Sequence, residues 1–288
     1  MSLRQKFKKI LPEISRTEQE ALDAGDTWIE ASIYQGNPDF DTLLQTAPSK
    51  ITEREQAFID GPLAELLEML DDMEVHNSDH IPAHVLQFLK DNKFFSFIIP
   101  KEYGGLEFSS YATSTIVASI STKSNPIATT VMVPNSLGPG ELLAHYGTQE
   151  QRDYYLPRLV DGRDIPCFAL TSPEAGSDAG GIPDRAIVTK KEIDGKEVIG
   201  LSCSWDKRYI TLAPISTVLG LAVKVFDPEG LLGNEKDLGI TCVLLPSDYD
   251  GVEIGNRHKP LGVNFYNGTT RGNDVFVPLD YVIGGAGN

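Results

Sequence analysis

The sequence changes character near residue 165, and this change limits the chain to a fold with two kinds of domain. Before that point, apolar residues recur at the spacing of amphipathic helices. After it, short runs rich in Val, Ile, Leu and Tyr are separated by Gly, Pro and Asp, which is typical of strands joined by turns. We therefore predict an α+β chain, with an N-terminal all-helical domain followed by an antiparallel β-barrel domain. The predicted divisions are an extension over residues 1–50, a helical domain over 51–165 and the β domain over 166–288.

Capping signals locate several of the predicted helices. Thr52 with Glu55, and Thr148 with Gln151, each have the spacing of a capping box, in which two side chains satisfy the free amides of a first helical turn. Apolar spacing predicts helices in the segments 61–73, 82–89, 109–122, 140–147 and 151–162. In the second part of the chain, "DG" at Asp194 and Gly195 lies between two strand-like runs and predicts a hairpin.

The charge of the chain excludes one class of partner. There are 41 Asp and Glu against 25 Lys and Arg, a net charge of −16, and such a field repels the phosphates of nucleic acids. The one basic run, "LRQKFKKIL" at Leu3–Leu11, suits either an ordinary terminal helix or weak docking on an anionic membrane. We find neither a membrane-spanning segment nor a signal peptide, and we expect a cytoplasmic protein or one peripheral at the inner membrane.

Residues that often bind metals are present without a metal-binding pattern. Three widely spaced cysteines lie in apolar strand-like runs, which predicts buried core thiols without disulfides or metal: Cys167, Cys203 and Cys242. Three histidines recur every fourth residue and would align on a continuous helix: His76, His80 and His84. Poor helix formers and Pro82 interrupt that run, so we predict a loop between helices there.

Familiar catalytic motifs are also missing. There is no P-loop and no G-x-G-x-x-G after a strand. "GSDAG" around Ser177 differs from the G-x-S-x-G nucleophile elbow, and nothing in the sequence supplies a base for that serine.

Two segments have patterns that fit either plain structure or a binding site. "CFALTSPEAGSDAGG" at Cys167–Gly181 is a strand-like run followed by turn residues, and it gathers the hydroxyls of Thr171, Ser172 and Ser177 at one strand end. In "SWDKRYITLAP" at Ser204–Pro214, alternate residues predict one face of a strand that suits cross-strand packing or a flat aromatic ligand: Trp205, Tyr209 and Thr211, with Lys207 among them.

These two segments resemble the flavin-binding signature of the acyl-CoA dehydrogenase family. The residues concerned are "FALTSPEAGSD" and, later in the chain, "KRYIT". Other family landmarks are matched by "PKEYGGLEFS", "HYGTQEQRDYYLPRLVDG" and "DVFVPLDYVIGG". The segments "PNSLGPGELL" and "RHKPLGVNFYNGTTRGNDVFVP" are similar to the large bacterial long-chain enzymes of fatty-acid β-oxidation.

The resemblance implies a site for FAD between the β domain and helical bundles. It assigns Leu170 and Thr171 to the pyrimidine edge of the flavin, through the main chain and the Thr hydroxyl, with Phe168 packing nearby. It puts Tyr209 beside the isoalloxazine and Thr211 near its reactive edge. Ser177 is implied to contact the pantetheine or phosphate region of acyl-CoA. Three positions depart from the common family pattern: Ser172 in place of Glu, Glu174 in place of Gly, and Tyr209 in place of Trp.

The family's third domain, a C-terminal four-helix bundle, is expected to be absent, because the chain stops at Asn288 directly after the middle domain's closing motif. The family's catalytic base is a glutamate of that bundle, so we assign no catalytic residue and no metal, and we expect this chain alone to be inactive. For the intact enzyme the resemblance implies long-chain acyl-CoA as substrate, an electron acceptor such as an electron-transfer flavoprotein, and a homo-oligomer. An oxidase is not distinguished. The alternative is a non-catalytic acyl-CoA-binding or regulatory module.

Overall fold

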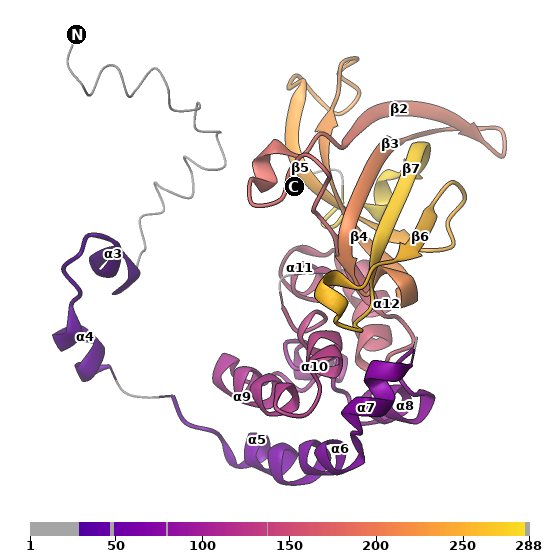
Figure 1. The fold of residues 1–288 in the computed structure, drawn as a ribbon. Helices are drawn as coiled ribbons and strands as arrows, with labels where there is room; N and C mark the ends of the chain where they lie inside the picture. The colour runs from indigo at the N-terminus through magenta and orange to yellow at the C-terminus, as the bar shows by residue number, and fades with distance from the viewer. Residues whose placement is uncertain (1–28, 47–48, 79, 137, 286–288) are drawn as a thin grey trace. The chain divides into compact units, whose positions relative to one another are not determined.

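The computed structural model describes residues 29–46, 49–78, 80–136 and 138–285 (Figure 1). The chain divides into two compact units between Lys50 and Ile51. In the first unit, α3 (Ile29–Tyr34) and α4 (Phe40–Gln45) are short helices without buried side chains. The basic segment Leu3–Leu11, predicted as a terminal helix or membrane contact, lies outside the described residues.

The second unit begins with helices. They are α5 (Glu53–Phe58), α6 (Ala64–Met69), α7 (Asp72–Asn77), α8 (Ala83–Asp91), α9 (Ser110–Ser121), α10 (Asn125–Met132), α11 (Pro139–Tyr146) and α12 (Gln149–Val160). Both predicted capping boxes are confirmed, with Thr52 and Glu55 at the start of α5 and Thr148 and Gln151 at the start of α12. Gln151 also donates from its side-chain amide to the carbonyl of Val282 (2.7 Å), which ties α12 to the chain that follows the sheet.

One helix differs from its prediction over residues 61–73. A five-residue π-turn, Ile59–Leu63, joins α5 to α6, so the helix starts earlier than Pro62 suggests. The wider π-turn accommodates the proline, which lacks an amide hydrogen and would clash with a regular helical turn. The helix then ends at Leu70, whose backbone is extended, and the carboxylate of Asp71 caps the next helix, α7.

A curled seven-stranded sheet follows the helices (Figure 1). Its strands are β1 (Pro166–Ala169), β2 (Arg185–Ile193), β3 (Lys196–Thr211), β4 (Val218–Phe226), β5 (Asp237–Pro246), β6 (Glu253–Arg257) and β7 (Asn267–Pro278). The order is β1-β4-β2-β3-β7-β6, and β5 also pairs with β4. The hairpin predicted at Asp194 and Gly195 is confirmed, since both residues have positive φ and Ile193 pairs with Lys196 across the turn.

The sheet is mixed, whereas the prediction was purely antiparallel. β1 and β2 both run parallel to β4, and the remaining pairings are antiparallel. Turn signals in a sequence reveal neighbours that follow one another along the chain, and those are antiparallel hairpins. Parallel neighbours are separated by intervening strands, so no local signal marks them.

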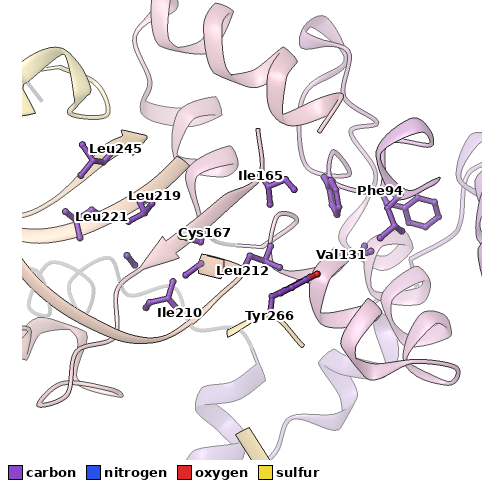
Figure 2. Close-up of a cluster of buried hydrophobic side chains, with 14 of the residues drawn as sticks. Phe94, Val131, Ile165, Cys167, Ile210, Leu212, Leu219, Leu221, Leu245 and Tyr266 are labelled. Carbon is purple, nitrogen blue, oxygen red and sulfur yellow. The ribbon is translucent and has the colours of Figure 1, made fainter. Parts of the chain in front are cut away.

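The largest hydrophobic cluster contains buried side chains from both the helices and the sheet. Figure 2 shows buried side chains of this core from Phe94 and Val131 in the helical part to Leu219, Leu221 and Leu245 in the sheet. Burying each such side chain fully stabilises the fold by about 1.5–3 kcal/mol. None of the helices in the described part of the chain is both long and apolar enough to cross a membrane.

Hydrogen bonds add to this contact between helices and sheet. The backbone N–H of Ile81 donates to the hydroxyl of Tyr266 (3.0 Å). The side-chain amide of Asn264 donates to the carbonyl of Val75 (2.7 Å). The segment that leads into β7 is therefore held against the helices.

Candidate functional site

Residues 170–184 form a loop between β1 and β2, two strands that pair with the same edge of β4. We call this segment the site loop. β1 pairs with residues 218–221 of β4, and β2 pairs with residues 224–226. β5 occupies the other edge along the same length. The chain thus leaves the sheet after β1 and returns to the same edge at β2. Polar groups at such a strand end are available for binding.

A β-bulge at the end of β3 meets the start of the site loop. Three steps along β3, from Lys207 to Ile210, face two along β7, so β3 carries one extra residue. Within the bulge, Tyr209 has a φ of 59°. The backbone N–H of Arg208 donates to the carbonyl of Thr171 (3.1 Å). The two segments singled out in the sequence therefore meet in space.

Thr171 presents hydrogen-bond donors at this junction. Among the described residues, neither its backbone N–H nor its hydroxyl has a hydrogen-bond partner, and the residue is half-buried. By contrast, the carbonyl of Thr171 accepts from Arg208, and the carbonyl of Leu170 accepts from the Nζ of Lys207 (2.8 Å). The acceptors at this strand end are occupied and the donors of Thr171 are free. A ligand that supplies acceptors can therefore use the N–H and the hydroxyl of Thr171.

Leu170 and Phe168 contribute mainly apolar surface. The N–H of Leu170 donates to the carbonyl of Phe168 (3.1 Å), so both backbone polar groups of Leu170 are already used. The two side chains are half-buried and pack against Ala175, Ile182 and Ala222. The family resemblance assigns the main chain of both Leu170 and Thr171 to a ligand. Of these two residues, Thr171 has a free backbone N–H and Leu170 does not.

Trp205 and Tyr209 were predicted to share one face of β3, and this is wrong. Trp205 is 5% exposed, and its indole N–H donates to the hydroxyl of Thr270 (3.2 Å). Tyr209 is 54% exposed. The extra residue in the bulge shifts the alternation of the strand, because a bulge places two successive residues opposite one. Tyr209 and the half-buried Thr211 keep their two-residue spacing beyond the shift.

Neighbouring side chains hold the ring of Tyr209. The imidazole of His258 lies 5.6 Å from it between ring centroids, at 47°. The guanidinium of Arg208 lies 5.2 Å from the ring centroid, a cation–π distance. At the end of β3, the hydroxyl of Thr211 accepts a long hydrogen bond from the side-chain amide of Asn267 (3.4 Å) and keeps its own hydrogen to donate.

Ser177 occupies a separate part of the site loop. It is exposed, and it has no hydrogen-bond partner among the described residues. The following residue, Asp178, accepts from the N–H of Gly181 (3.1 Å) and closes a short helical turn. The structure brings Leu170 and Thr171 to the end of β3, and Phe168 packs in the same small apolar cluster as Leu170. Among the described residues, no hydrogen bond joins Ser177 to Tyr209 or Thr211.

Sequence reasoning missed a buried ion pair beneath this junction. The Nζ of Lys207 lies 2.6 Å from Oδ2 of Asp184, and both side chains are almost completely buried. Burial lowers the pKa of Lys207, although the neighbouring Asp184 acts in the opposite direction. The hydroxyl of Ser172 donates to the same carboxylate. The one available signal was a lysine at an inward position of a strand, where a charge needs a partner.

Among the residues that the structure describes, no three His, Cys, Asp or Glu side chains could hold a metal ion together. His76 lies in α7 and His84 in α8, and the helix breaks at Ser78 between them, so the predicted interruption is confirmed. Cys167 and Cys203 are buried as predicted, whereas Cys242 is half-buried. Burial raises the pKa values of all three thiols to about 12.

Two family models match consecutive parts of the chain. The N-terminal domain model of acyl-CoA dehydrogenase matches residues 52–163, and the middle domain model matches residues 167–275. The chain belongs to the acyl-CoA dehydrogenase family. The matched acyl-CoA dehydrogenase domains contain α5–α12 and most of the sheet, and the site loop lies wholly within the middle domain.

Curated acyl-CoA dehydrogenases are similar to this chain over most of its length. A probable acyl-CoA dehydrogenase FadE10 of Mycobacterium bovis is 31% identical over 84% of this chain and 35% of its own. The mitochondrial very long-chain specific acyl-CoA dehydrogenase of Mus musculus is 27% identical over 94% of this chain and 41% of its own. The chain therefore spans a third to two fifths of the length of these relatives.

The fold matches a solved acyl-CoA dehydrogenase. The structure of butyryl-CoA dehydrogenase from Megasphaera elsdenii aligns with a TM-score of 0.67 at 20% identity, covering 83% of this chain and 60% of that one. At this identity the match shows the fold alone. It confirms the helical region followed by a curled sheet domain.

Proposed function

We propose that this chain supplies the middle-domain half of the FAD site in an acyl-CoA dehydrogenase that acts on long-chain acyl-CoA. The observation that carries the proposal is Thr171, whose N–H and hydroxyl have no partner among the described residues while the neighbouring carbonyls are occupied. The pyrimidine edge of a flavin offers oxygen and nitrogen acceptors that match these donors. The family of the chain supports the same cofactor.

The residues of the chain take distinct roles in this proposal. Thr171 donates to the flavin edge, and Phe168 and Leu170 support it with apolar surface. Tyr209, fixed by the bulge and its neighbours, covers the ring, and the hydroxyl of Thr211 donates near the reactive edge. When bound, FAD accepts the hydride that leaves the acyl chain.

Ser177 is proposed to bind acyl-CoA. It is exposed in the site loop, past the strand end that would hold the flavin, and its hydroxyl has no other described partner. Long-chain preference is supported by the similarity to the very long-chain mouse enzyme. Each methylene group of the acyl tail that is buried contributes about 0.8 kcal/mol to binding. We also propose an electron-transfer flavoprotein as acceptor and a homo-oligomeric enzyme with a peripheral position at a membrane.

One observation favours a non-catalytic acyl-CoA-binding module as the second candidate. The carboxylate in contact with the flavin-facing strand end, that of Asp184, is buried in an ion pair with Lys207 and cannot remove a proton from a substrate. In the dehydrogenase proposal the base comes from elsewhere in the enzyme.

Purification of the complete gene product tests both candidates. The dehydrogenase proposal expects a yellow protein whose flavin absorbance is bleached by long-chain acyl-CoA and much less by a short-chain thioester. A protein that binds FAD without being bleached favours the module. A colourless protein that takes up no added FAD contradicts the cofactor assignment.

A further inference from the structure

Lys207 is the most deeply buried cation at the site, and its ammonium group is bound by three oxygen atoms of the site loop. Its side chain is completely buried, and its Nζ lies 2.6 Å from Oδ2 of Asp184, 2.8 Å from the carbonyl oxygen of Leu170 and 3.2 Å from Oγ of Ser172. An ammonium group has three hydrogens to donate, so this geometry satisfies it fully. Two of the three partners are the residues on either side of Thr171.

Asp184 ties the other end of the site loop to the same point. Its Oδ2 accepts from Lys207 and from the hydroxyl of Ser172, and its Oδ1 accepts from the backbone N–H of Asp206 (2.9 Å). Its carbonyl accepts from the N–H of Lys224 in β4 (3.0 Å). The exit and the return of the site loop are thus fastened together at one buried charge pair on β3.

Stability alone does not account for such a pair. Replacing a buried ion pair by apolar side chains of similar volume is often neutral or stabilising, because removing both charges also removes the cost of desolvating them. A buried pair also fixes the positions of the groups that are hydrogen-bonded to it. Here it fixes the carbonyl of Leu170 and the hydroxyl of Ser172, while the N–H of Arg208 fixes the carbonyl of Thr171.

We propose that Lys207 and Asp184 are positioning residues for the flavin, which act by holding residues 170–172 so that the N–H and hydroxyl of Thr171 point to the ligand. The inference rests on the proposed FAD site. Neither charged group touches the flavin, since both are buried behind the strand end. The pair therefore affects the affinity of the site for FAD and the absorption spectrum of the bound flavin.

The test compares charge-free and charge-relocated variants of the complete gene product. Lys207→Met with Asp184→Asn removes both charges while keeping similar volume and an acceptor for Asp206. We expect its melting temperature to stay close to that of the wild type, its FAD Kd to rise by about tenfold, and the absorption maxima of its bound flavin to shift. A purely structural role would change the melting temperature without changing the flavin spectrum.

Moving the carboxylate from residue 184 to residue 172 gives a second comparison, which still tests the inference if the first variant does not fold. Asp184→Ser alone should weaken FAD binding by about tenfold, and adding Ser172→Asp should restore the Kd to within about threefold, because a carboxylate again lies beside Lys207. Folded variants that bind FAD as tightly as the wild type, or a folded double variant without restoration, would overturn the inference. A wild-type protein that binds no FAD would instead overturn the proposed function from which it is drawn.

Discussion

The backbone N–H of Arg208 donates to the carbonyl of Thr171 across 3.1 Å, and this bond joins the bulged end of β3 to the first turn of the site loop. Because the carbonyl of Thr171 is occupied, its N–H and hydroxyl are the groups left for a ligand.

Thr171→Val removes one donor and keeps the shape of the side chain. We expect the FAD Kd to rise by about tenfold, the value of one hydrogen bond, with little change in melting temperature. Titration of the apoprotein with FAD measures the effect. Thr189→Val, on β2 and half-buried like Thr171, is the matched control and should bind FAD normally. Equal Kd values for all three proteins would remove Thr171 from the site.

Tyr209→Ala separates ligand contact from stability. The ring is 54% exposed, so its loss should change the free energy of unfolding by less than about 1 kcal/mol. The absorption spectrum and Kd of the flavin should both change, because the aromatic neighbour of the ring is gone. Tyr111→Ala, in α9 and 48% exposed, should change neither. An unaltered flavin spectrum in Tyr209→Ala would place the ring away from the cofactor.

Gly272→Ala should destabilise the sheet by about 1–3 kcal/mol, because overpacking forces a buried neighbour to shift. A Cβ at this position would lie 2.1 Å from the indole of Trp205, which is buried and hydrogen-bonded to Thr270. Chemical denaturation measures the change. Gly176→Ala is the control: the residue is exposed and its added Cβ would meet no other part of the chain within 4 Å, so stability should change by less than about 0.5 kcal/mol. Equal effects would contradict the packing of Trp205.

Glu55 gives the helical region an acid-sensitive contribution to stability. Burial acts to raise the pKa of its carboxylate, but hydrogen bonds from Thr52 and from the N–H of Ser109 (2.7 Å) outweigh burial and lower it to about 2. A lowered folded-state pKa stabilises fully above the unfolded value of 4.5 and is lost as pH falls toward 2. The contribution is on the order of 3 kcal/mol.

Urea unfolding at about pH 7 and about pH 3 checks this prediction. The difference in unfolding free energy between the wild type and Glu55→Gln should shrink at the lower pH. Glu53→Gln, exposed in the same turn, should leave stability nearly unchanged at both. A difference that is independent of pH would show that the carboxylate charge at residue 55 is unimportant.

Features that depend on residues near one another in the chain were predictable. The capping boxes of α5 and α12 and the hairpin at Asp194 and Gly195 need only a few neighbouring residues, and all are present. The change from helices to strands near residue 165 follows equally from local periodicity, since α12 ends at Val160 and β1 begins at Pro166.

Features that depend on pairing between distant segments were not predictable. The bulge beside Tyr209 exists because β3 has one more residue than β7 in that interval, which neither strand shows alone. The partnership of Lys207 with Asp184 joins the bulged end of β3 to the residue that precedes β2. For the same reason the face of Trp205 was assigned wrongly, whereas the meeting of the Thr171 and Tyr209 segments was expected from the family resemblance.

The placement of β1 and β2 end to end along β4 has a consequence for sequence changes in the site loop. The ladder on that edge is complete without residues 173–183, so the number and chemistry of these residues can change while both strands keep their register and Leu170, Ser172 and Asp184 keep their bonds to Lys207. Insertion, deletion or exchange within this interval would therefore alter the surface beside the strand end without disturbing the sheet. The sheet behind that interval would stay constant while the surface in front of it changes.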